Sequence, residues 1–197
     1  MIAFTTTTSS TINKIYTPDH AIKRILAFDP GSTMMGWCVI DYDSTLHRFN
    51  ILHHETITGT QLLKQRKTMQ AKFTKSFIVL DVYYDIFCQL ITTYQPNYIV
   101  TEGAFYHRFV QAYASLTLVI HTLRRACWVL QCDNIHEVAP METKKTITGN
   151  SMADKTLIKT CILAMPEIDN LTDVDDISEH EFDAIAHGIT FIRKHLV

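Results

Sequence analysis

Two carboxylates directly follow short apolar segments that are typical of buried β-strands. Asp29 follows four mostly apolar residues and precedes Pro30 and Gly31, whose backbone preferences favour a tight turn. Glu102 ends a second apolar segment, residues 98–102. A buried carboxylate is unfavourable unless it is paired, hydrogen-bonded or bound to a metal ion. Either acid alone is also consistent with an ordinary turn or surface residue, so the interpretation depends on what else the chain brings to these positions.

A helix start further along the chain carries a third group of polar side chains. Ser178 and Glu181 have the spacing of a capping box, which predicts that a helix begins here. His180 and Asp183 are three residues apart and His187 is seven from His180, so all three lie on one side of this helix. His180 and Asp183 are candidate ligands or catalytic groups, although a helix N-terminus also favours such residues without any function. His187 is interpreted as a packing or supporting residue.

The elements that must position these side chains alternate between strands and helices. We expect an α/β fold with a five-stranded mixed sheet, a three-strand meander plus two further strands, flanked by helices. The predicted strands are residues 25–29, 35–42, one more before residue 57, 98–102 and 134–139. Two long helical segments are predicted, residues 61–94 (one long helix or a broken pair) and residues 105–130. Two short helices follow: one after Pro140 that stops at Gly149, and one from a capping-box-like pattern at Ser151 to about residue 165. A last helix starts at residue 178.

Length and composition favour a single globular domain. The chain has 197 residues, of which 47% are hydrophobic and 19% charged. We expect residues 1–22, which are rich in Thr and Ser, to form a disordered leader and residues 23–197 to form one domain. No apolar run reaches the roughly 18 residues of a membrane span. Five scattered cysteines without a CxxC pair indicate free thiols in a reducing compartment such as the cytoplasm.

Charge is distributed unevenly along the chain. The net charge is −2, but residues 166–183 hold eight acids and no Lys or Arg. The rest of the chain has 18 basic against 12 acidic residues, so its body is mildly basic. A basic face can bind phosphates even when the total charge is near zero. Residues 64–75 carry five basic side chains, which are interpreted most simply as a solvated helix face.

Four segments together resemble the RuvC-type Holliday junction resolvases of the ribonuclease-H-like nuclease superfamily. They are FDPGSTMMGWCVI (residues 28–40), QPNYIVTEGAF (95–105), KKTITGNSMADK (144–155) and HEFDAIAHGIT (180–190), in the order and at close to the spacing of that family. The resemblance covers about residues 24–197 and implies a ribonuclease-H-like fold.

The resemblance also implies a set of site residues. Asp29 and Glu102 fall on the first two catalytic, metal-binding acids of the family, and His180 and Asp183 fall on its last pair. The family has either Asp or His where this chain has His180. The remaining candidates are DNA-binding: Phe105 falls on an aromatic residue used against unpaired bases at the junction, Lys144 and Lys155 fall on basic residues facing the cleavage site, and Lys145 lies beside them.

Phosphodiester hydrolysis explains why such residues would be combined. Two Mg²⁺ ions about 3.5–4 Å apart can activate a water, relieve charge in the transition state and assist the leaving oxygen. Carboxylates are the ligands that Mg²⁺ prefers, and Mn²⁺ is expected to substitute. Asp29 is expected to bridge both ions, with Glu102 on one and Asp183 on the other. His180 is expected either to bind a metal ion or to act as a general base.

The sequence therefore predicts a metal-dependent endonuclease that resolves Holliday junctions by paired symmetric nicks. Its expected partners are four-way DNA junctions and a second copy of the chain, joined through the helix at residues 105–130; no membrane partner is expected. A related nuclease acting on other branched DNA or on RNA–DNA hybrids would share the same acids. A non-catalytic scaffold that binds branched DNA is a further alternative, whereas an actin-like kinase would need a second half that 197 residues do not provide.

Overall fold

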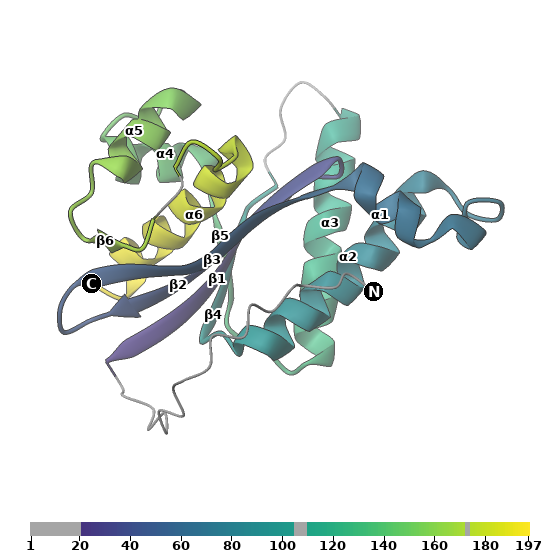
Figure 1. Ribbon diagram of the computed structural model, residues 1–197, viewed down its shortest axis with the longest axis horizontal. Helices are drawn as coiled ribbons and strands as arrows, with labels where there is room; N and C mark the ends of the chain where they lie inside the picture. The colour runs from purple at the N-terminus through teal and green to yellow at the C-terminus, as the bar shows by residue number, and fades with distance from the viewer. Residues whose placement is uncertain (1–20, 105–109, 172–173) are drawn as a thin grey trace.

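A mixed sheet of six strands separates two layers of helices (Figure 1). The computed structural model describes residues 21–104, 110–171 and 174–197. Within them the strands lie in the order β5-β4-β1-β2-β3-β6, and β1 pairs antiparallel with β2 but parallel with β4. Their bounds are β1 (Ile22–Asp29), β2 (Met34–Asp43), β3 (Arg48–Thr58), β4 (Tyr98–Glu102), β5 (Ile135–Val138) and β6 (Ile168–Asp169). The predicted α/β class and the three-strand meander are confirmed.

The helices divide between the two faces of the sheet. Two long helices cover one face and three helices cover the other (Figure 1). The first layer contains α2 (Lys75–Tyr94) and α3 (Val110–Val129), and the second contains α4 (Pro140–Thr148), α5 (Lys155–Leu163) and α6 (Glu179–His195). A short helix α1 (Gly59–Gln65) and a 3-10 turn η1 (Lys67–Met69) connect β3 to α2. Each face of the sheet thus has its own hydrophobic core.

Strand alternation places the two strand-end acids on the same face. In β1, Ala27 packs in the core beneath α6, whereas Phe28 packs in the core beneath α2 and α3. The next residue, Asp29, therefore points to the α6 side. In β4, Val100 belongs to the core beneath α6. Glu102, two residues further along the strand, points to the same face of the sheet. Because β1 and β4 are parallel neighbours, both acids emerge at the same edge of the sheet.

Helix α6 crosses the sheet at a distance that only glycine permits. Gly36 of β2 pairs with Asp29, and a Cβ atom built on it would lie 2.0 Å from the carbonyl oxygen of His180. On the helix, a Cβ on Gly188 would lie 2.7 Å from Ile40 Cδ1. These two positions let the backbone of α6 lie directly on the sheet, with its first turn beside the end of β1.

The sheet contains one strand more than predicted. The expectation of five strands is wrong because β6 (Ile168–Asp169) pairs in parallel with Phe49 and Asn50 of β3. This strand lies inside the acidic segment and is only two residues long, so it has no periodicity to detect. Its position depends on tertiary contacts, among them a hydrogen bond of 2.8 Å from Arg48 Nε to Asp169.

Several helix boundaries also differ from the prediction. The expected helix at residues 61–94 is a broken pair, because α2 starts anew at Lys75, where the Thr74 hydroxyl caps it by accepting from Phe77 N. α5 begins at Lys155 with Asp154 as its N-cap, not at a capping box on Ser151. The helix after Pro140 does stop at Gly149, whose φ is 77°.

The N-terminal prediction is tested only at its end. Residues 1–20 lie outside the described residues, whereas Ile22, which we assigned to the leader, is the first residue of β1. In the described part of the chain, α2 alone matches a membrane span by length and composition. Within that helix, 44% of the apolar window is buried in the fold, where it forms the core beneath the sheet.

The close approach at Gly36 generates a testable prediction. We expect Gly36→Ala to lower the free energy of unfolding by about 1–3 kcal/mol, because the added methyl group collides with helix backbone rather than with a movable side chain. Urea unfolding monitored by circular dichroism measures this change. Gly103→Ala is the matched control, since its Cβ would meet nothing closer than 3.4 Å. Equal unfolding free energies for the two variants would contradict the proposed packing constraint.

Candidate active site

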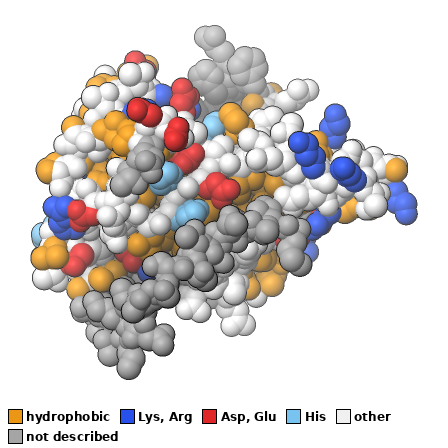
Figure 2. Space-filling view, viewed as in Figure 1, with side chains coloured by type: hydrophobic (Ala, Val, Ile, Leu, Met, Phe, Trp, Pro, Cys, Tyr) orange, Lys and Arg blue, Asp and Glu red, His pale blue; other side chains and the backbone are white. Residues whose placement is uncertain are grey.

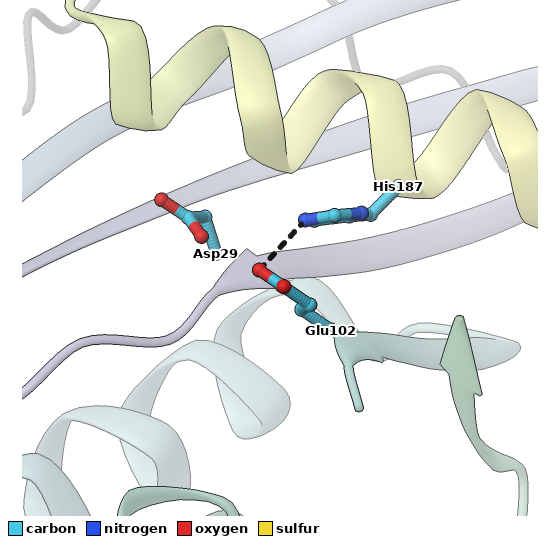
Figure 3. Close-up of side chains that lie close together, drawn as sticks. All are labelled: Asp29, Glu102 and His187. Carbon is cyan, nitrogen blue, oxygen red and sulfur yellow. Dashed lines mark ion pairs between the residues drawn. The ribbon is translucent and has the colours of Figure 1, made fainter. Parts of the chain in front are cut away.

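The two strand-end carboxylates converge with a histidine of α6. Asp29 is 8% exposed and lies beside Glu102, and His187 reaches them from the third turn of α6 (Figure 3). One ligand atom from each of these three side chains lies within 4.8 Å of the other two. The group therefore offers two oxygens and one nitrogen to a single small volume.

The first five residues of α6 add two more of the predicted side chains. His180 Nδ1 lies 2.6 Å from Asp29 Oδ2, so this histidine is hydrogen-bonded to the acid at the end of β1. Asp183 Oδ2 lies 2.8 Å from Lys155 Nζ, which comes from the start of α5. Together with the strand-end acids and His187, these residues line a cleft of about 340 Å³. The helical spacing predicted for residues 180, 183 and 187 is thus confirmed.

The concentration of charge in this cleft changes the proton affinities of its groups. Burial raises the pKa of Asp29, although its hydrogen bond with His180 opposes that shift. The same hydrogen bond raises the pKa of His180. Burial disfavours protonation of His187, but the Glu102 carboxylate outweighs it, so the pKa of His187 is raised. The raised pKa values of the two histidines therefore reflect the carboxylates beside them, whereas that of Asp29 reflects mainly its burial.

The predicted lysines differ in their positions. Lys144 and Lys155 both line the cleft, whereas Lys145 is exposed on α4 and is not among the lining residues. Burial lowers the pKa of Lys155, but the Asp183 carboxylate outweighs this effect and raises it, so the side chain is held as a cation. Phe105 lies outside the described residues.

His187, which the sequence predicts to be a packing or supporting residue, lies in the cleft. It is only 4% exposed, its Nδ1 lies 3.0 Å from Thr143 Oγ1, and its Nε2 lies 3.6 Å from Glu102 Oε2. The available signal was its spacing of four from Asp183 and seven from His180, which puts it on the same side of the helix. Its distance from Glu102 depends on how α6 crosses β4, and no local pattern contains that information.

A hydrogen-bond network fixes the rotation of α6 from the side opposite the cleft. Glu181 is buried and accepts from the Thr56 hydroxyl at 3.0 Å and from the Ser178 backbone N–H at 3.3 Å, and it also bonds His54 Nδ1. Ser178 in turn caps the helix by accepting from Glu181 N at 3.2 Å. Burial raises the pKa of Glu181, but the hydrogen bonds from His54, Ser178 and Thr56 hold it down at about 2. The predicted capping box is confirmed and tied to β3.

Charged side chains segregate on the surface around the site. Figure 2 shows acidic and histidine side chains gathered over the start of α6, with Lys and Arg side chains gathered at the far end over α1 and the residues that follow it. Lys64, Lys67, Lys72 and Lys75 of that basic end are all exposed, as expected for a solvated face. Arg66 is held by Asp81 and Asp85.

Comparisons with known proteins identify relatives of this chain. A family model described as crossover junction endodeoxyribonuclease RuvC matches residues 25–191. The crossover junction endodeoxyribonuclease RuvC of Caldicellulosiruptor saccharolyticus is 26% identical over 168 residues, which cover 83% of this chain and 91% of that protein.

Solved structures show the same fold. The structure of Thermus thermophilus RuvC matches with a TM-score of 0.66 and 15% identity, covering 87% of this chain and 96% of that chain. T. thermophilus RuvC in complex with a Holliday junction substrate matches with a TM-score of 0.61 and 15% identity, covering 85% of this chain and 92% of that chain. The ribonuclease-H-like fold expected from the sequence is therefore confirmed.

The Glu181 network predicts a specific pH dependence of stability. A carboxylate whose folded pKa lies below its ordinary value of 4.5 stabilises the fold above that value, and the stabilisation is lost as pH falls toward about 2. We expect Glu181→Gln to flatten this acid-induced loss, measured as the free energy of unfolding in urea between about pH 6 and pH 3. Glu179→Gln, an exposed acid of the same helical turn, serves as the control. A wild-type pH profile in the Glu181 variant would show that the network does not stabilise the fold.

Proposed function

The chain belongs to the crossover junction endodeoxyribonuclease RuvC family, and from this we propose that it cuts four-way DNA junctions at the cleft formed by β1, β4 and α6. One observation supports this assignment most strongly. Asp29 and Glu102 come from separate strands, yet they meet each other and α6 in a single cleft that two lysines also line. Paired symmetric nicks across the junction are the expected products.

The donor set of the cleft fits a divalent cation. Carboxylate oxygens from Asp29, Glu102 and Asp183 are hard ligands of the kind that Mg²⁺ prefers, and a buried acid such as Asp29 is unfavourable beside other acids without a positive partner. We assign Asp29 as the shared ligand of two ions, with Glu102 and Asp183 each on one, and expect Mn²⁺ to replace Mg²⁺. When bound, such ions activate water and stabilise the charge of phosphodiester cleavage.

The remaining side chains act on the substrate and its protons. Lys155 and Lys144 present ammonium groups to the cleft, where they can hold the scissile phosphate as point charges. His180 is hydrogen-bonded through Nδ1 to Asp29, which fixes the orientation of its ring. That hydrogen bond also raises the pKa of His180, and we assign this ring to exchanging a proton beside Asp29.

Substitution of the shared ligand tests this function. We expect Asp29→Asn to reduce cleavage of a four-way junction by at least about a hundredfold in either Mg²⁺ or Mn²⁺, because an amide cannot hold two cations as a carboxylate does. Gel analysis of labelled junctions, with flaps and RNA–DNA hybrids alongside, measures the rate and the substrate preference. Asp175→Asn removes an exposed acid of the acidic segment and is the matched control. Cleavage by Asp29→Asn at the wild-type rate would refute the assignment.

We also propose that the protein forms a homodimer through α3. This helix packs inward through Val119 and Leu123, whereas Val110, Leu118 and Trp128 on its other side are 61%, 50% and 84% exposed. Large apolar side chains exposed along one helix face are typical of an interface. A two-fold dimer would present two clefts to the two-fold symmetric junction.

Removing the most exposed of these side chains tests the dimer. We expect Trp128→Ser to shift the protein from dimer to monomer in sedimentation velocity at micromolar concentration, while its circular dichroism stays unchanged. Met152→Ser is the control, because Met152 is 78% exposed but lies before α5, away from this face. A wild-type protein that sediments as a monomer, or a Trp128 variant that stays dimeric, would contradict the proposal.

The cysteines of the chain indicate the cellular environment in which it acts. All five cysteines are free thiols, and none has the spacing of a structural disulfide framework. We therefore propose a reducing, DNA-containing compartment such as the cytoplasm as the place where this protein acts.

A further inference from the structure

We propose that His187 is a direct nitrogen ligand of the cation held by Asp29 and Glu102, and that it shifts the preference of this site from Mg²⁺ toward Mn²⁺. The inference rests on the proposed function only in requiring a divalent cation in the cleft. It adds an imidazole to the set of Asp29, Glu102, His180 and Asp183 that the family resemblance implies.

The geometry places His187 Nε2 where a ligand is needed. The ring is buried, and Figure 3 shows it directed from α6 toward the two strand-end acids. Nε2 lies 3.6 Å from Glu102 Oε2, which is too long for a hydrogen bond, and this nitrogen has no hydrogen-bond partner among the described residues. A buried polar atom without a partner is unfavourable and calls for an explanation. A cation between Nε2 and the carboxylates would provide one.

The spacing of the donors is compatible with one ion. Donor atoms bound at about 2.1 Å to the same cation lie at most about 4.2 Å apart. The ligand atoms of Asp29, Glu102 and His187 already lie within 4.8 Å of one another. An adjustment of about half an ångström therefore brings all three into coordination distance.

The opposite ring nitrogen prepares His187 for this role. Nδ1 lies 3.0 Å from the hydroxyl oxygen of Thr143, a residue of α4 that is 2% exposed. When Nδ1–H donates to this hydroxyl, Nε2 keeps its lone pair and directs it at the carboxylates. Histidine ligands of metal ions are commonly oriented in this way, by a hydrogen bond from the second nitrogen. Thr143 is then a positioning residue.

The chemistry of imidazole gives the proposed selectivity. Mg²⁺ strongly prefers oxygen ligands, whereas imidazole nitrogen binds transition-metal ions such as Mn²⁺ more readily. Replacing the imidazole by an amide of similar size should therefore weaken Mn²⁺ binding more than Mg²⁺ binding. The readout is a ratio of two affinities, which a residue that merely packs in the core would not change.

The experiment uses the purified full chain without DNA and with Mn²⁺ or Mg²⁺ as the probe. Isothermal titration gives the two affinities, and pulsed electron paramagnetic resonance of bound Mn²⁺ detects a directly coordinated nitrogen. We expect wild type to show histidine nitrogen coupling, and His187→Gln to lose it and to bind Mn²⁺ about tenfold or more weakly. His180→Gln is the matched control and should keep the coupling, because His187 is then the remaining imidazole that lines the described cleft.

Two outcomes would overturn the inference. One is nitrogen coupling and Mn²⁺ affinity in His187→Gln equal to wild type, and the other is no nitrogen coupling in folded His180→Gln. The second measurement stays decisive even if the His187 variant fails to fold. Since neither measurement uses DNA, nitrogen-coordinated Mn²⁺ in a protein that leaves junctions uncut would refute the proposed function and keep this inference. Junction cleavage by a protein whose bound Mn²⁺ shows no nitrogen coordination would refute this inference and keep the proposed function.

Discussion

The close contact between α6 and the sheet is the constraint on which the site depends. The carboxylates of β1 and β4 are fixed by strand pairing, but the cleft exists only where the first three turns of α6 pack over them. Gly36 on β2 and Gly188 on α6 remove the side chains that would hold the two backbones apart. The Glu181 network then fixes the rotation of the helix, because it ties the first turn to Thr56 and His54 of β3. Distance and rotation are thus set by separate contacts.

This arrangement gathers charges that repel one another. Asp29 is nearly buried and lies close to two further carboxylates, so the protein carries an unfavourable electrostatic energy in its own site. His180 and Lys155 partly compensate, each by contacting one acid directly. These contacts leave Glu102 without a direct ammonium partner among the described residues, so a bound cation would lower the electrostatic energy of the cleft. The stability of the site and its chemistry therefore have the same electrostatic origin.

Much of this architecture could be predicted from the sequence because its signals are local. The apolar segments that end at Asp29 and Glu102, and the capping box at Ser178, each lie within a few residues and required no knowledge of the fold. The convergence of those segments came from a family resemblance, and the matched family model and the fold agree with it. The expectation of five strands failed because β6 is held by contacts with β3 rather than by its own sequence.

The positions of the lysines and of His187 depend on tertiary structure in the same way. Lys144 and Lys145 are indistinguishable in a sequence, but consecutive residues of a helix point about 100° apart, so only Lys144 reaches the cleft. His187 was interpreted as a packing or supporting residue because residues in the middle of an apolar helix face are usually buried in the core. Its partners Thr143 and Glu102 come from α4 and β4, which are far from it in the sequence. Contacts of this kind become visible only in three dimensions.

The placement of α6 late in the chain has a consequence for biosynthesis. A ribosome that has produced β1 and β4 has already made both strand-end acids, yet residues 179–195 are still missing and the cleft has no second wall. A nascent polypeptide that stalls before this point carries the acids without His180, Asp183 and His187, which line the finished cleft. The cleft therefore forms only after residues 179–195 have been synthesised and α6 has packed on the sheet.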